Sequence, residues 1–168
     1  MRKISLKILM AMMVIGLAAS AAGCGAPVLV RPSRNPDAQT VKITGSCEIS
    51  VLNNTVTVSG ENNIMNGALI QIAVVGQDGL TLDSAIIKKS SDQISHSFGI
   101  TDKYNGVKSI IGFITCAPSH YGTQPDEVYK SYGHKFENID AAEENYIWDG
   151  AGNIIIFRSK ETVDLPAQ

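Results

Sequence analysis

The chain has 168 residues, 18% of them charged, and a formal net charge of −2 at pH 7. This length suits one domain with a buried core plus a short extension, whereas two full domains would be crowded. The acidic balance argues against a protein that grips a nucleic-acid backbone, because such binding needs clustered Lys and Arg. We therefore expect no nucleic-acid partner.

The first residues have the pattern of an export signal. Arg2, Lys3 and Lys7 lie around the start of an apolar or small-residue run over 8–22, as in the charged, hydrophobic and exit regions of a secretory signal. The run is shorter than the roughly 20 apolar residues that a membrane-spanning helix needs. We predict a helical signal peptide over 1–23 and an extracytoplasmic location for the rest of the chain.

The stretch Ala21-Ala22-Gly23-Cys24 resembles the lipobox of bacterial lipoproteins, in which a small residue precedes a lipidated cysteine. The resemblance implies diacylation of Cys24 and cleavage before it, although Ala21 stands where the family usually has leucine. Two acyl chains on one residue anchor a protein stably in the membrane, whereas one chain binds marginally. Cleavage would also remove three basic residues, which takes the net charge from −2 to −5. The alternative is ordinary cleavage after Ala22 and a freely secreted protein.

Residues 24–40 contain three of the six prolines and show no sustained periodicity. We predict a flexible tether there and a folded domain over 41–168. If Cys24 carries lipid, Cys47 and Cys116 remain as a pair outside the reducing cytosol. They either form a disulfide or are two separate buried thiols that pack as small apolar side chains. Both alternatives stay open, because a sequence does not show whether two Cβ atoms come within bridging distance.

Beyond the tether, apolar residues recur every second position, which is the period of a β-strand. The runs over 68–76 and 107–116 are almost continuously apolar, as is typical of strands buried on both faces. Turn residues separate the runs, and the polar residues 137–144 are expected to cover a sheet edge or form a loop. We predict strands near residues 47–51, 56–58, 68–76, 80–88, 94–100, 107–116, 146–148 and 153–157.

One segment departs from the strand pattern. Thr123, Pro125 and the two following acids suit the cap and first turn of a helix, because acids there meet the positive end of the helix dipole. Gly133 is a suitable terminator. We predict a short helix over 124–132 with Val128 and Tyr132 on one face.

Several short strands, frequent turns and little helix favour a mainly β fold, an antiparallel sandwich of the immunoglobulin or fibronectin type. The segment VTVSGENNIMNGALIQIAVVGQDG, residues 56–79, resembles the immunoglobulin-like modules of surface lipoproteins from Gram-positive bacteria. The resemblance extends over roughly residues 47–115. It implies a fold and a setting at the cell envelope rather than an activity.

No motif of a known active site is present: the chain lacks Gly-x-Ser-x-Gly, a phosphate-binding Gly-Lys-Ser/Thr loop and His-Glu-x-x-His. His96, His120 and His134 lack the short spacing to another His or Cys that zinc sites show. We therefore predict no catalytic residues, no metal and no cofactor. The alternative is a secreted hydrolase or metal-dependent enzyme that uses His120, His134 and nearby carboxylates.

The best candidate for recognition is segment 118–136, which is rich in tyrosine and histidine. Tyrosine favours interfaces because it joins a large apolar ring to a polar tip, and the end loops of a domain often bind partners. We predict a non-catalytic binding or structural module at the cell envelope, with a membrane anchor and an envelope protein or glycan as partner. The predicted surface consists of His120, Tyr121, Tyr129, Tyr132 and His134. Alternatively these rings fold back to cap the sandwich, which suits Tyr132 better than Tyr121 because Tyr132 shares a helix face with Val128.

Overall fold

The computed structural model describes residues 36–165. The predicted signal peptide, Cys24 and most of the predicted tether lie outside these residues. Within 36–165, no helix has both the length and the apolar character needed to cross a membrane.

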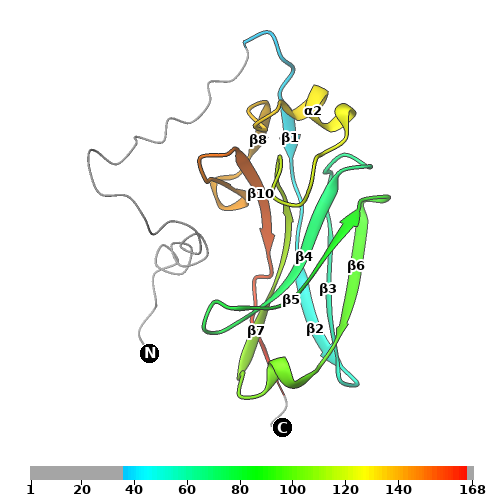
Figure 1. The fold of residues 1–168 in the computed structure, drawn as a ribbon, viewed down its shortest axis with the longest axis vertical. Coiled ribbons are helices and arrows are strands. Elements are labelled where there is room, and N and C mark those ends of the chain that lie inside the picture. The colour runs from blue at the N-terminus through cyan, green and yellow to red at the C-terminus, as the bar shows by residue number, and fades with distance from the viewer. Residues whose placement is uncertain (1–35, 166–168) are drawn as a thin grey trace, which may run out of the picture.

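Two antiparallel sheets face each other as a sandwich (Figure 1). The chain crosses between them after β3, after β5 and after β6, as in immunoglobulin-like domains. The smaller sheet has the order β2-β3-β6 and consists of β2 (Glu48–Leu52), β3 (Thr55–Glu61) and β6 (Gln93–Gly99). The larger sheet has the order β5-β4-β7-β10-β9, with β11 also paired to β7, and consists of β4 (Leu69–Gly76), β5 (Thr81–Lys88), β7 (Ser109–Cys116), β9 (Tyr146–Trp148), β10 (Asn153–Arg158) and β11 (Val163–Asp164). The prediction of a mainly β, antiparallel sandwich with one short helix is confirmed.

The remaining elements are short. They are the parallel pair β1 (Val41–Ile43) and β8 (Ile139–Ala141), the helix α2 (Asp126–Tyr132), and two 3-10 turns, η1 (Asp102–Tyr104) and η2 (Glu143–Asn145). In Figure 1, α2 and the β1–β8 pair lie at the end of the sandwich where the described chain begins. The described chain finishes at the opposite end.

The β2–β3 hairpin shows how the sequence produces the sandwich. Val56 and Val58 are fully buried, whereas Thr57 between them is partly exposed, so the alternating pattern separates a core face from a solvent face. The hairpin turns at Asn53 and Asn54, whose φ angles are 49° and 60°. Asparagine tolerates this left-handed conformation, which the tightest hairpin turns require.

The central strands β4 and β7 carry apolar residues on both faces. Ile72 and Ile114, which lie side by side in the ladder, are fully buried in the main core between the sheets. The alternate residues point to the other side of the larger sheet and form a second, smaller cluster of Ala73, Val75, Ile111, Phe113 and Ile156. Burial on both faces explains why these two strands read as continuous apolar runs.

Two local expectations differ from the structure. The helix begins at Asp126 with Pro125 at its N-cap and no side-chain cap, so the capping role predicted for Thr123 is wrong. The polar stretch 137–144 contains a strand, β8, which pairs in parallel with β1. Three-residue strands whose partner lies far away in the chain leave no periodic signal, which is why the sequence pattern did not indicate them.

Replacing Ile114 by alanine tests the main core. Because the side chain is fully buried, we expect Ile114→Ala to lower the free energy of unfolding by about 2–5 kcal/mol, from lost burial and the cavity left behind. Urea unfolding measures this change. The control is Leu52→Ala, at a residue that is 71% exposed, for which we expect a change within about 0.5 kcal/mol. Similar losses in both variants would contradict this account of the core.

Candidate binding surface

Three loops meet at the end of the sandwich that carries α2: residues 117–123 after β7, residues 133–138 after α2, and the turn 149–152 between β9 and β10. The backbone N–H of Asn153 donates to the Lys135 carbonyl at 2.9 Å, and Asn153 Nδ2 donates to the Phe136 carbonyl at 2.9 Å. A Cβ atom on Gly152 would lie 2.5 Å from Pro118 Cγ. The third loop therefore packs so closely on the other two that only glycine fits there.

His120 and Asp149 clamp the first loop to the third. The imidazole Nε2 lies 2.7 Å from Asp149 Oδ2. The other oxygen of the same carboxylate accepts the backbone N–H groups of Ala151 at 2.9 Å and Gly152 at 3.1 Å. The Asp149 side chain is 9% exposed and that of His120 is 38% exposed. A nearly buried and fully bonded carboxylate thus holds a partly exposed imidazole in one orientation.

Tyr121 and Tyr129 each anchor a polar tip in the protein. The Tyr121 hydroxyl lies 2.6 Å from Thr115 Oγ1, and burial raises the pKa of this phenol above its usual range. The Tyr129 hydroxyl donates to the Pro118 carbonyl at 2.7 Å, and its ring lies 4.9 Å from the exposed ring of His134. Both tyrosines remain partly exposed, so they combine fixed geometry with accessible ring area.

Tyr132 belongs to the core rather than to the exposed surface. It is 1% exposed, its hydroxyl accepts the Met65 backbone N–H at 2.6 Å, and its ring packs edge-on against Phe136 at 5.3 Å. Burial raises its pKa to about 12. The alternative stated for this residue, that its ring folds back to cap the sandwich, is what the structure shows.

The sequence pattern did not single out Gln124, which fixes the whole segment to the larger sheet. Its side chain is buried, Oε1 accepts the Leu69 N–H at 2.8 Å, and Nε2 donates to the carbonyls of Leu69 and Ala117, each at 2.8 Å. The side-chain amide thus takes the place of a neighbouring strand's peptide group beside β4. A glutamine in a polar stretch gives no local sign of such a role.

The two histidines of the enzyme alternative have different contacts. His120 contacts Asp149 and the ring of Tyr121, whereas His134 contacts Tyr129. Within residues 36–165, no group of three or more His, Cys, Asp or Glu side chains is arranged to hold a metal ion.

Cys47 and Cys116 are two free, buried thiols in the structure. Cys47 lies beside the backbone of Ser159, whose N–H donates to the Gly112 carbonyl at 3.0 Å. Cys116 lies four residues beyond Gly112 on β7, which at the strand rise is about 13 Å away. A disulfide needs Cα atoms within about 7 Å. Of the two alternatives, the structure therefore shows two separate thiols and not a disulfide.

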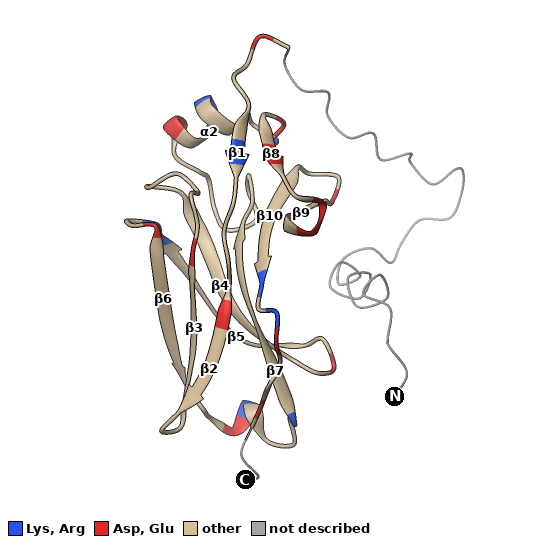
Figure 2. Cartoon of the chain, turned by 180° about the vertical axis from the view of Figure 1, so that it is seen from behind, with Lys and Arg blue, Asp and Glu red and all other residues tan. Residues whose placement is uncertain are grey.

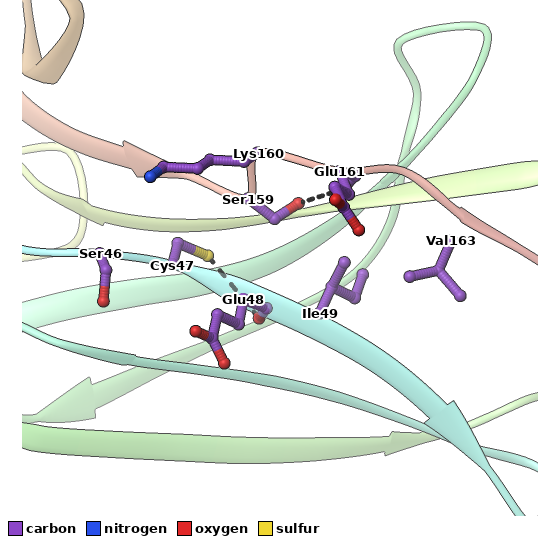
Figure 3. Close-up of a pocket in the computed structure, with 8 residues that line it drawn as sticks. All are labelled: Ser46, Cys47, Glu48, Ile49, Ser159, Lys160, Glu161 and Val163. Atoms are coloured by element: carbon purple, nitrogen blue, oxygen red, sulfur yellow. Dashed lines mark hydrogen bonds between the residues drawn. The ribbon is translucent and has the colours of Figure 1, made fainter.

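A groove of about 380 Å³ with a mixed polar and apolar lining runs between residues 46–49 and 159–163 (Figure 3). Burial raises the pKa of the Cys47 thiol in this groove to about 12, so little thiolate forms near neutral pH. The Ser159 hydroxyl accepts the Gly112 N–H at 3.1 Å and donates to the Glu161 carbonyl at 2.9 Å. Both groups have structural roles, and neither is activated as a nucleophile.

The three loops together form one surface, called here the loop surface, which offers the ring faces of His120, Tyr121, Tyr129 and His134 in a setting of mixed charge. Figure 2 shows acidic and basic residues interspersed around α2, β1 and β8 instead of one extended field of a single sign. Accessible ring faces suit partners that offer flat apolar groups. Protein loops and the flat faces of sugar rings both present such groups.

No protein-family model, no curated protein and no solved structure matches this chain.

Replacing Gln124 tests how the loop surface is held in place. Gln124→Leu keeps a similar volume but removes a hydrogen-bond partner from the Leu69 N–H and from two carbonyls, so we expect a loss of about 1–3 kcal/mol in unfolding free energy. Hydrogen exchange should also quicken at the Leu69 amide.

The matched control is Gln93→Leu, at an exposed glutamine whose amide contacts Glu61. We expect a change within about 0.5 kcal/mol for this variant. Unchanged exchange at Leu69 in Gln124→Leu would show that the segment is held by other contacts.

Proposed function

We propose that this chain is a membrane-anchored, extracytoplasmic lipoprotein whose immunoglobulin-like domain is a non-catalytic binding or structural module at the cell envelope. The export-signal pattern over 1–23 and the lipobox-like cysteine Cys24 support the location. One structural observation supports the binding role. The His120–Asp149 clamp joins two loops and holds partly exposed aromatic groups rigidly at one end of the domain.

The position of the loop surface relative to the proposed anchor limits which partners it can reach. The described chain begins beside α2 and β1, at the same end as the three loops (Figure 1). A tether over residues 24–40 cannot span more than about 60 Å, even if fully extended. On this proposal, the loop surface faces the zone close to the membrane, where envelope proteins and cell-wall glycans are within reach.

An enzyme is the alternative proposal, and the same His120–Asp149 contact favours it. A carboxylate that orients an imidazole is part of the machinery of base catalysis in many hydrolases. Metal analysis of the purified protein separates the two proposals: one stoichiometric metal ion, lost in both His120→Ala and His134→Ala, would favour the enzyme.

Replacing the predicted lipidation site tests the anchor. We expect Cys24→Ala to move the protein from the membrane fraction to the soluble fraction, because two acyl chains are lost. Cys47→Ala is the control and should remain in the membrane fraction. Mass spectrometry of the mature N-terminus gives an independent reading, and an unmodified end at Gly23 or Gly25 would rule out the lipoprotein.

Binding to envelope material tests the loop surface. Using purified cell-wall glycan and detergent-solubilised envelope protein as probes, we expect His120→Ala to weaken retention about tenfold or more, as for a central interface residue. Leu80→Ala is the control, at a residue that is 65% exposed in the β4–β5 turn. Equal effects of the two changes, or no retention of the unmodified protein on either probe, would count against this surface.

A further inference from the structure

A lysine side chain is fully buried at the point where the chain leaves the larger sheet. Lys89 follows β5 directly, and its side chain is 0% exposed. Its Nζ lies 2.9 Å from Asp92 Oδ1 and 3.1 Å from Asn66 Oδ1. The amine thus touches a carboxylate and a primary amide at the same time.

Backbone contacts hold the three groups in this arrangement. The Lys89 N–H donates to the Ala68 carbonyl at 2.9 Å, and the Gly67 N–H donates to the Lys89 carbonyl at 2.7 Å. These two bonds extend the β4–β5 ladder by one step and fix Asn66 beside Lys89. The Asn62 N–H donates to the Asp92 carbonyl at 3.0 Å, which holds the third group.

As an ordinary ion pair, this arrangement is unfavourable. A buried ammonium loses its hydration, and attraction repays that loss only when the geometry is excellent and further hydrogen bonds satisfy the remaining protons. Lys89 Nζ contacts two acceptors, Asn66 Oδ1 and Asp92 Oδ1, with its three protons. The Asp92 side chain is 69% exposed, so its own charge is largely solvated. Converting the amine to a neutral amide would remove the buried charge.

We propose that Lys89 and Asn66 are joined by an intramolecular isopeptide bond. Lys89 Nζ attacks Asn66 Cγ, the carbon bonded to the Oδ1 atom that it already contacts. Asp92 accepts one proton from the Lys89 ammonium, and Nζ passes a second proton to Asn66 Nδ2 as the bond between Cγ and Nδ2 breaks. The released ammonia takes the first proton from Asp92 and leaves as ammonium. One carbon–nitrogen bond forms, another breaks, and no oxidant, metal or second reactant is needed.

This bond would join the two connections that run between the sheets at one end of the sandwich. Asn66 lies between β3 and β4, and Lys89 lies between β5 and β6. The two described cysteines are unbonded, so the amide would supply the covalent link that they do not. The proposal is independent of the binding role and of the lipid anchor.

Peptide mapping of the unfolded, full-length mature protein tests the bond directly. Trypsin cleaves after Lys42, Lys88, Lys89 and Lys103, so an unlinked chain yields peptides 43–88 and 90–103. With the bond, Lys89 resists cleavage, and peptide 43–88 stays joined to peptide 89–103 with the loss of one ammonia. Fully separated peptides would overturn the proposal. A loss of water that maps to Asp92 would overturn the choice of Asn66.

Variants separate the roles of the three groups. Lys89→Arg keeps a positive charge but has no nucleophilic amine, and Asn66→Ala has no acyl carbon, so we expect the joined peptide to disappear in both. Asp92→Asn should lose most of it because the proton acceptor is gone. Lys88→Arg, at the exposed neighbouring lysine, is the matched control and should keep the link. An undiminished link in Asp92→Asn would overturn the proton-transfer role of Asp92.

Discussion

Close packing of two sheet faces is the constraint on which the rest of this structure depends. Side chains from both sheets share a single core, in which each is fully shielded from water. They include Val56 and Val58 from the smaller sheet and Ile72 and Ile114 from the larger one. Burying such β-branched side chains is the main favourable term in the folding of a domain of this size. Once these faces meet, the strand ends are fixed in space, and so are the loops that extend from them.

The loop surface has a different physical basis, because buried polar contacts hold it against the core. The Gln124 amide pairs with Leu69 as a strand would, the Tyr132 hydroxyl accepts the Met65 N–H, and the Asp149 carboxylate accepts two backbone N–H groups besides its contact with His120. Each of these groups would be costly to bury alone, and each is satisfied by a partner. Side chains on loops that are fixed in this way lose little conformational freedom on binding, which lowers the entropic cost of recognition.

Buried reactive groups in this protein fall into two kinds. Burial raises the pKa of the Cys47 and Cys116 thiols to about 12, so both act as packing groups. Lys89, in contrast, is buried with its amine against an amide and a carboxylate. The difference lies in what each side chain faces. Each thiol contacts a backbone carbonyl and stays protonated, whereas on our proposal the Lys89 amine reacts with the side-chain amide that it contacts.

The sequence by itself determined the longer strands, because a period of two and the turn-forming pair Asn53-Asn54 act within a few residues. It also limited the helix to the region around Asp126–Tyr132, through Pro125 and Gly133. Only the tertiary structure decided that β1 pairs with β8, that Gln124 meets Leu69 across 55 residues of chain, and that Tyr132 meets Met65 across 67. The same holds for the His120–Asp149 contact, the contact of Lys89 with Asn66, and the separation of Cys47 from Cys116. These pairings depend on the order of strands in two sheets, and sheet order results from long-range packing that leaves no periodic trace in the residues that it brings together.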